Sequence, residues 1–260
     1  MGSEVKDRLD REREFHDARF DGEDSRNSGR FYAINKASDR FFRDAIEALP
    51  AGSNFLDYGC GEGAYCAVHA AENGHSVTAI DISPVAVEKA RERAEEFGVA
   101  DRIEFGVMNA EDLQLPDASF DAVGGLGVLH HLDLELGLDN ITRVMKSDAT
   151  AFFVEPMGHN PAINMYRDRT PSERTPDEHP LMTEDVDAIG SRFERCDATY
   201  FHLLGLLAIP AIGRSFLDPL VDRLDQLDRV LFDHVSPARK FAWMVGLQMS
   251  RPRAAATAPR

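Results

Sequence analysis

Short apolar runs alternate with longer amphipathic stretches through the middle of the chain. Five runs have the length and pattern of strands: SNFLDY (53–58), SVTAID (76–81), RIEFGV (102–107), SFDAVGGL (119–126) and TAFFVEP (150–156). Three intervening stretches repeat their apolar positions at helical spacing: GAYCAVHAAENG (63–74), SPVAVEKARERAEEFG (83–98) and LELGLDNITRVMK (134–146). This alternation predicts βαβ units, and therefore an α/β fold with a mostly parallel sheet and helices on both of its faces.

The pattern changes on both sides of this region. Residues 4–20 predict a charged helix with few apolar positions, which is marginal on its own, and residues 35–49 predict a second helix. After the fifth strand, residues 158–181 contain four prolines and no apolar alternation, so they predict a long ordered loop or lid. A helix over 183–193, strands over 193–201 and 240–249, and apolar helical segments between them complete seven strands.

These segments predict an organisation in three parts. Residues 1–50 are expected to form an N-terminal helical cover, and residues 51–250 a single domain in which 158–182 is the lid. Residues 251–260 are expected to be a disordered tail. The two N-terminal helices and the lid should together enclose a cavity. The first helix is too poor in apolar residues to be stable alone, and a loop of this length is too long to be a mere connection.

The net charge of −16 argues against binding to nucleic acid or to an anionic membrane, since both need clustered Lys and Arg. The three cysteines form no CxxC pair, so they indicate neither a disulfide framework nor a zinc site, and no metal is expected. The first ten residues lack the apolar segment of a signal peptide, and the longest apolar run, 203–213, is too short to span a bilayer. A cytoplasmic monomer or homodimer is expected.

Three glycines at alternate positions follow the first predicted strand, in DYGCGEG. Glycines at the carboxyl end of a strand in a parallel sheet let backbone amides come close to a ligand. Asp81 ends the second predicted strand, where a carboxylate can accept hydrogen bonds from both hydroxyls of a ribose. The ligand is therefore expected to be a nucleoside-bearing cofactor, either a nicotinamide dinucleotide or S-adenosylmethionine (SAM).

The residues around the glycines favour SAM. Ala64 stands where the dinucleotide fingerprint prefers its third glycine, and Asp57 would repel a pyrophosphate but attract the cationic amino group of a methionine moiety. After the third predicted strand, the polar sequence NAED (109–112) can read the edge of an adenine.

Five ordered motifs, DYGCGEG, AIDIS, NAEDLQLPDASFDAV, LHHL and RVMK followed by FFVEP, resemble the class I SAM-dependent methyltransferases in their small-molecule, ubiquinone/menaquinone-biosynthesis-like ("type 11") branch. The resemblance covers roughly residues 55–156. It implies a Rossmann-like fold, SAM as cofactor with S-adenosylhomocysteine as product, and a small-molecule acceptor from secondary metabolism or from lipid, sugar or quinone-type biosynthesis.

The resemblance also implies residue roles. The match to Asp57 contacts the methionine amino group, the match to Asp81 binds the ribose, and the loop at Asn109–Ala110 reads adenine; the family usually has Asp at the position of Asn109, whose amide oxygen can still accept from the adenine amino group. The complete expected cofactor set is Asp57, Gly59, Cys60, Gly61, Asp81, Ile82, Asn109, Ala110, Glu111 and Leu126.

Candidates for catalysis and acceptor binding are less specific. His130 and His131 follow the fourth strand, where a histidine can act as a base, although either can equally cap a helix or fill space. Tyr32 is a third catalytic candidate from the cover, with Phe15, His16 and Phe20 as its neighbours there, and its alternative role is packing. In the lid, Tyr166, Arg167, Arg169, Arg174 and His179 are expected to bind an anionic acceptor group or, for the arginines, to pair with carboxylates nearby.

Two other functions stay open at this point. The chain could bind SAM as a non-catalytic regulator, or bind NAD(P) as an oxidoreductase. A protein or nucleic-acid methyltransferase is disfavoured, because neither a basic surface nor a recognition domain is evident.

Overall fold

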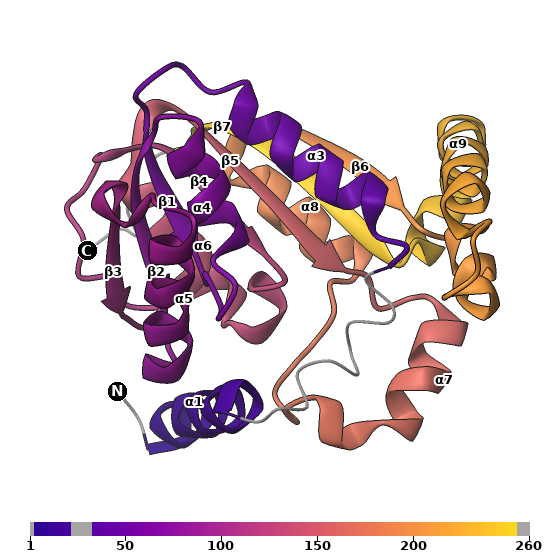
Figure 1. Ribbon diagram of the computed structural model, residues 1–260, viewed down its shortest axis with the longest axis horizontal. Helices are drawn as coiled ribbons and strands as arrows, with labels where there is room; N and C mark the ends of the chain where they lie inside the picture. Colours follow the sequence, from indigo (N-terminus) through magenta and orange to yellow (C-terminus); the bar gives the residue numbers. More distant parts are fainter. Residues whose placement is uncertain (1–2, 22–32, 254–260) are drawn as a thin grey trace.

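A seven-stranded sheet forms the centre of the computed structural model, which describes residues 3–21 and 33–253 (Figure 1). Its strands are β1 (Asn54–Tyr58), β2 (Ser76–Asp81), β3 (Ile103–Val107), β4 (Phe120–Leu126), β5 (Met145–Pro156), β6 (Phe193–Phe201) and β7 (Met244–Pro252). The order is β3-β2-β1-β4-β5-β7-β6, and only the pairs made by β7 are antiparallel. The predicted mostly parallel α/β fold is therefore confirmed.

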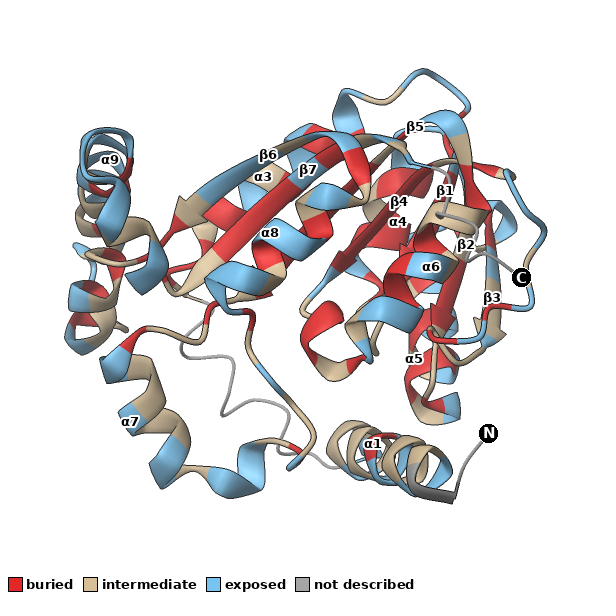
Figure 2. Ribbon diagram, turned by 180° about the vertical axis from the view of Figure 1, so that it is seen from behind, coloured by how far each residue is buried: buried red, intermediate tan, exposed pale blue. Residues whose placement is uncertain are grey.

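Helices cover both faces of this sheet, as Figures 1 and 2 show. The helices are α1 (Ser3–Asp21), α3 (Lys36–Glu47), α4 (Tyr65–Glu72), α5 (Pro84–Glu96), α6 (Leu134–Val144), α7 (Pro161–Arg169), α8 (Thr183–Ser191) and α9 (Leu217–His234). Buried side chains of α3, α4 and α5 share one core cluster, and those of α6 and α8 share the other. Each half of the core thus lies between one sheet face and its own helices.

Adjacent strand residues divide between the two cores because successive side chains of a strand point to opposite faces. Phe152 stacks on Phe55 on the α3 side, with 5.6 Å between ring centroids, whereas Phe153 lies edge-on to Tyr58 on the α6 side at 6.2 Å. The central strands β1 and β4 are buried on both faces for most of their length, which explains their nearly continuous apolar sequences, whereas the edge strands β3 and β6 are partly exposed.

The strand boundaries differ from the sequence-based expectation by more than one residue at β5 and β7, and β7 begins at Met244 rather than at residue 240. β5 begins at Met145 rather than Thr150, because Met145 pairs with Phe120 beyond an irregularity in the β4–β5 register. The prediction of a disordered tail from residue 251 is wrong at its start: β7 continues to Pro252, which pairs with Phe193, and Arg253 donates to the Phe193 carbonyl at 2.8 Å. Residues 254–260 lie outside the described residues.

The two N-terminal helices have different positions. α3 is part of the fold's core, where the Phe42 ring meets Phe152 at 5.0 Å between centroids. α1 instead lies beyond the carboxyl ends of the parallel strands (Figure 1). The expected single helical cover over residues 1–50 is therefore divided, and α3 contributes no described residue to the cavity beside α1.

The lid contains a helix that the sequence-based expectation missed. Within residues 158–182, α7 is followed by a short 3-10 turn at Pro171–Glu173, and the segment is closed at its base by a bridge between Met157 and Leu181. Asn160 caps α7 by accepting from Ala162 N (3.0 Å) and Ile163 N (3.3 Å), with Pro161 in the first turn. This Asn-Pro pair is a helix-start signal that could have been read from the sequence.

Substituting Asn160 by alanine is expected to destabilise the protein by about 1–2 kcal/mol, because the cap and the Nδ2 bond to the Phe241 carbonyl (2.6 Å) are both lost. Thermal unfolding should show a midpoint lower by about 2–8 °C. As the matched control, Asn160→Asp keeps a capping oxygen, so its loss of stability should be roughly half as large. Equal losses in the two variants would show that the cap contributes nothing.

Candidate active site

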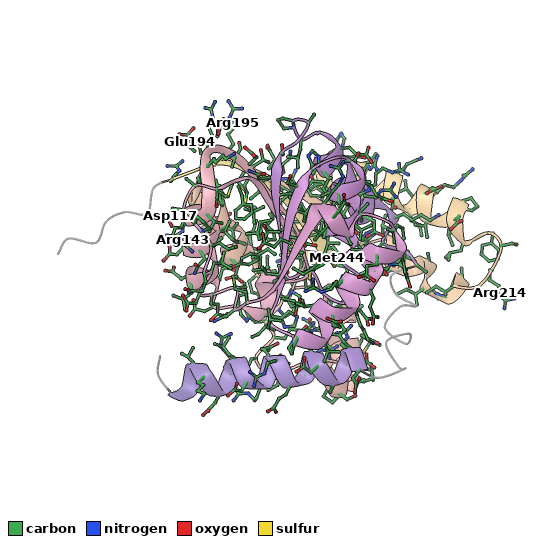
Figure 3. The ribbon with its side chains drawn as sticks, turned by 60° about the vertical axis from the view of Figure 1, so that its left-hand side comes forward. Asp117, Arg143, Glu194, Arg195, Arg214 and Met244 are labelled. Atoms are coloured by element: carbon green, nitrogen blue, oxygen red, sulfur yellow. The ribbon has the colours of Figure 1, made fainter. Side chains whose placement is uncertain are left out.

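The carboxyl ends of the parallel strands open into a cavity of about 390 Å³. Its wall is formed by the loops after β1, β2, β3 and β4, by the end of β5, by α1 and the lid, and by Met244 at the start of β7. Met244 is labelled in Figure 3. Figure 1 shows α1 and α7 lying beyond the strand ends on this side. Strands, helix and lid therefore face one shared space.

The glycine loop forms part of the wall and has backbone conformations that other residues rarely adopt. Gly59 has φ +81°, and a Cβ at this position would lie 2.7 Å from Val128 Cγ2. Gly61 has φ +57°, and a Cβ there would meet open space. Gly61 N also donates to Asp81 Oδ2 at 2.9 Å, so the loop is held directly against the end of β2.

Asp81 presents its carboxylate to the cavity. Its second oxygen accepts from Ser83 N at 2.9 Å, and burial raises the pKa of the carboxyl above its ordinary value. A carboxylate has about four acceptor positions, so two remain for further donors. Ile82, Asn109, Ala110 and Leu126 complete the predicted residues on this part of the wall, where Met108, which the sequence-based prediction missed, joins them.

Three predicted cofactor residues do not lie on the wall. Asp57 is fully buried under the loop, where Oδ2 accepts from Ala67 N at 2.9 Å and Oδ1 has no hydrogen-bond partner among the described residues. Cys60 is buried, and its amide donates to the Ile80 carbonyl. Glu111 is occupied by Arg8 Nη2 (2.7 Å) and by Asp133 N (2.7 Å). In this conformation, none of these three side chains can contact a ligand in the cavity directly.

The two predicted histidines both lie on the wall, with different surroundings. His130 Nδ1 is 2.7 Å from Glu155 Oε2, and Glu155 also accepts from the amides of Val128 and Leu129, so it fixes the whole turn. Burial lowers the pKa of His130, with a contribution from His131, against the opposing effect of Glu155. His131 lies beside His130, at 4.1 Å between ring centroids, and faces α1.

α1 contributes five wall residues: Leu9, Glu12, His16, Arg19 and Phe20. The helix is anchored by Arg8 to Glu111, by Arg11 to Asp177 (2.8 Å), and by a hydrogen bond from Thr175 Oγ1 to Glu12. Glu12 is only 4% exposed; burial alone would raise its pKa, but the neighbouring His131, His16 and Thr175 side chains hold the pKa below the ordinary range. The sequence-based prediction named His16 and Phe20 in this helix but missed Glu12, which the regular spacing of four residues between Glu12, His16 and Phe20 could have indicated.

The lid brings only some of its predicted residues to the cavity. Tyr166, Arg167 and Arg174 lie on the wall, whereas Arg169 and His179 are exposed and do not. Arg167 pairs with Glu178 inside the lid, at 2.8 Å between Nη1 and Oε1. Tyr32 lies outside the described residues, so its predicted place beside the histidines stays a prediction.

Comparisons of the sequence and the fold with known proteins find methyltransferases. Residues 56–153 match the family model of a methyltransferase domain. The 27-O-demethylrifamycin SV methyltransferase of Amycolatopsis mediterranei (strain S699) is 45% identical over 84 residues, 32% of this chain and 31% of that protein. Residues 56–153 are therefore a domain of the class I SAM-dependent methyltransferase family.

Other methyltransferases resemble longer parts of the chain. Ajmaline N-methyltransferase of Rauvolfia serpentina is 30% identical over 175 residues, 66% of this chain and 56% of that protein. A crystal structure of geranyl diphosphate C-methyltransferase from Streptomyces coelicolor A3(2), with Mg²⁺, geranyl diphosphate and S-adenosylhomocysteine, shares the fold with a TM-score of 0.60 and 14% identity, over 85% of this chain and 79% of that one. The alignments span about a third to just over half of the two curated relatives.

The cavity fits the cofactor of this methyltransferase family. Open space above Gly61 and a wall carboxylate at Asp81 suit a ribose, and Ile82, Met108 and Leu126 add apolar side chains to the wall, which suit a purine ring. The amide oxygen of Asn109 is held by Glu111 N at 3.0 Å and stays an acceptor on the same wall. In the described part of the chain, no helix has the length and apolar character needed to cross a membrane.

Proposed function

We propose that this chain transfers a methyl group from SAM to a small-molecule acceptor. The observation that carries the proposal is that one cavity joins the glycine loop and Asp81 at one end to α1 and the lid at the other. A donor held at the first end and an acceptor held at the second would share one water-poor space. Binding of SAM would place an electrophilic methyl group on its sulfonium sulfur within that space.

Residues of the chain would contribute mainly position and enclosure. The amides of the glycine loop and the Asp81 carboxylate would orient the donor, and the wall at Val128–His131 would face the acceptor. α1 and the lid would exclude water, with Arg8 and Arg11 holding the helix in place. The rate of a displacement at carbon depends most on the alignment of the reacting groups and on the exclusion of water.

The acceptor end of the wall has both apolar and charged residues. Ile163, Trp243 and Met244 provide apolar surface, and the arginines Arg167 and Arg174 lie there together with Glu173 and Glu178. An acceptor with a hydrocarbon body and one polar group suits such a wall. Lipid-, sugar- or quinone-type intermediates and secondary metabolites fall within this class.

Calorimetric titration with SAM and S-adenosylhomocysteine should show binding of both, with dissociation constants in the micromolar range. Incubation with methyl-labelled SAM and pools of hydroxylated and amine-bearing small molecules should then label an acceptor. Binding without label in any pool would favour a non-catalytic SAM-binding protein, and binding of NAD in place of SAM would contradict the proposal. A cytoplasmic site of action is part of the proposal, and the free cysteines Cys60, Cys66 and Cys196 are consistent with it.

Asp57 is expected to make the affinity for SAM depend on pH. Burial, together with the charge of Asp81, raises the pKa of Asp57 to about 7, against the hydrogen bond from Ala67 N. Only the ionised carboxylate attracts an ammonium group across the loop, and the amino group of SAM stays protonated up to about pH 7.7. The affinity should therefore rise about fivefold from pH 6 to pH 7, by the ionised fraction of a group with this pKa.

The control for this prediction is Asp57→Asn, which keeps an oxygen for Ala67 N but cannot ionise. Calorimetry on this variant should give weaker binding at pH 7 and a smaller slope between pH 6 and pH 7. Burial also raises the pKa of Asp81, which lies on the cavity wall and stays unchanged in this variant. An unchanged slope in the variant would show that Asp57 is not the titrating group.

A further inference from the structure

Three side chains from separate parts of the chain converge between α1 and the strand ends. Glu12 and His16 lie one helical turn apart on α1, and His131 follows β4. Glu12 Oε2 is 3.2 Å from His131 Nδ1 and 3.6 Å from His16 Nε2. All three residues lie on the cavity wall. The cluster therefore borders the space assigned to the reaction.

These side chains leave buried polar atoms without partners. Glu12 Oε2, His16 Nδ1 and His131 Nδ1 are each buried and have no hydrogen-bond partner among the described residues. Glu12 itself is 4% exposed, and its other oxygen is occupied by Thr175 Oγ1. Glu12 Oε2 and His131 Nδ1 lie 3.2 Å apart without completing a hydrogen bond, and His16 faces Glu12 with Nε2 rather than with its unpartnered Nδ1. Because an unsatisfied buried polar atom is unfavourable, Glu12 Oε2 and His131 Nδ1 call for a further partner.

The donor set and the spacing suit a metal ion. Two imidazoles and one carboxylate can each give one ligand atom, and these atoms lie within 4.8 Å of one another. Metal–ligand bonds of about 2.0–2.1 Å in a tetrahedral site place neighbouring ligand atoms about 3.4 Å apart. The two measured separations from Glu12 Oε2, 3.2 and 3.6 Å, lie on either side of that value.

A second group that shares His131 is less suitable. It consists of His130, His131 and Glu178. His130 Nδ1 is bound to Glu155 at 2.7 Å, and Glu178 Oε1 is bound to Arg167 at 2.8 Å while lying 3.8 Å from His130 Nε2. Glu178 Oε1, one ligand atom of this group, is thus already engaged by Arg167, whereas Glu12 Oε2 and His131 Nδ1 complete no hydrogen bond.

We propose that Glu12, His16 and His131 bind one first-row divalent metal ion, with Zn²⁺ as the best match to two imidazoles and a carboxylate. Three protein ligands leave a coordination position on the cavity side, as open metal sites require. The net charge of −16 favours the approach of a cation. An oxygen atom of the acceptor would take the open position, and this last point alone rests on the proposed methyl transfer.

Metal binding is testable on the full chain without acceptor or turnover. Protein stripped with EDTA and dialysed should take up one Zn²⁺ per chain in calorimetry and in metal analysis, with a dissociation constant in the micromolar range or below. Co²⁺ should bind at the same site and give the visible absorption of a low-symmetry four- or five-coordinate complex. Failure of the full chain to bind Zn²⁺ would overturn the site, and would leave a bare Glu12–His131 charge pair in its place.

Two single variants and two matched controls locate the site. Glu12→Gln and His16→Ala should each weaken Zn²⁺ binding about a hundredfold or more. The controls Glu14→Gln, on the same helix, and His179→Ala, in the lid, change exposed residues. Both proteins should bind Zn²⁺ with the affinity of the parent protein. Equal affinity in all four proteins would overturn the assignment.

The two proposals can fail separately. SAM binding to the EDTA-stripped protein tests the cofactor site with no metal present, and Zn²⁺ binding is measured with no SAM present. Should Glu12→Gln or His16→Ala unfold, the Zn²⁺-induced rise in the parent's unfolding midpoint gives an independent readout. If Zn²⁺ does not raise that midpoint, the site is overturned.

Discussion

Replacing Asp81 with alanine is expected to weaken the binding of SAM about ten- to hundredfold, equivalent to losing charge-assisted hydrogen bonds worth about 1–3 kcal/mol. Asp81 is the carboxylate that lies on the cavity wall at the end of β2, and its two free acceptor positions suit the two ribose hydroxyls. Calorimetric titration with SAM and with S-adenosylhomocysteine should show the same loss, because both carry the ribose.

Asp112→Ala is the matched control for Asp81→Ala. Asp112 is an exposed carboxylate after β3 that accepts from Gln114 and does not line the cavity, so its removal should leave the affinity unchanged. Because Asp81 also accepts from Gly61 N and Ser83 N, unfolding midpoints of both variants should be compared with the parent. Undiminished affinity in a folded Asp81→Ala protein would mean that the ribose binds elsewhere.

Deleting residues 1–21 is expected to lower the rate of methyl transfer about a hundredfold or more, while SAM affinity stays within about tenfold of the parent. α1 supplies five wall residues, and its loss would open the cavity to water beside the reacting groups. The glycine loop and Asp81 do not belong to α1, so most of the cofactor site would survive. Single-turnover rates and calorimetric titration on the same preparation separate the two effects.

The control for the deletion is a double substitution of exposed α1 residues, Arg13→Ala with Glu14→Ala, which leaves the anchors at Arg8 and Arg11 in place. This protein should turn over as the parent does. Normal turnover in the deleted protein would show that α1 is not part of the active site. Loss of SAM binding with the fold intact would instead assign α1 to the cofactor site. Glu12→Gln, in which α1 keeps its anchors at Arg8 and Arg11, separates loss of enclosure from loss of the proposed metal.

The part of the cavity wall at the strand ends was accessible from the sequence because its residues are local to those ends. Gly59, Gly61, Asp81 and Asn109 each follow or end a recognisable apolar strand, and parallel strands bring such ends to one edge. The prediction failed to separate wall residues from buried ones. Asp57 lies within β1 and belongs to the buried pattern of that strand, which the motif alone does not reveal.

The lid and the N-terminal helices were harder to predict, for different physical reasons. α7 is short and has no apolar stripe, so only its Asn160-Pro161 start signals it. α3 and α1 are neighbours in the sequence, but the apolar side chains of α3, such as Phe42 and Ile46, can be buried only against the sheet. α1 has no comparable apolar face, and ion pairs at Arg8 and Arg11 decide where it lies.

The sequence by itself determined the α/β class, the seven strands and the cofactor loop, because each depends on periodicity and turn chemistry within a few residues of the chain. Only the tertiary structure decided that Glu12 and His16 meet His131, and that Arg167 is engaged by Glu178. Such contacts depend on how α1 and the lid pack across the strand ends. That packing is set by long-range charge pairs and burial, which leave no periodic signal in the sequence.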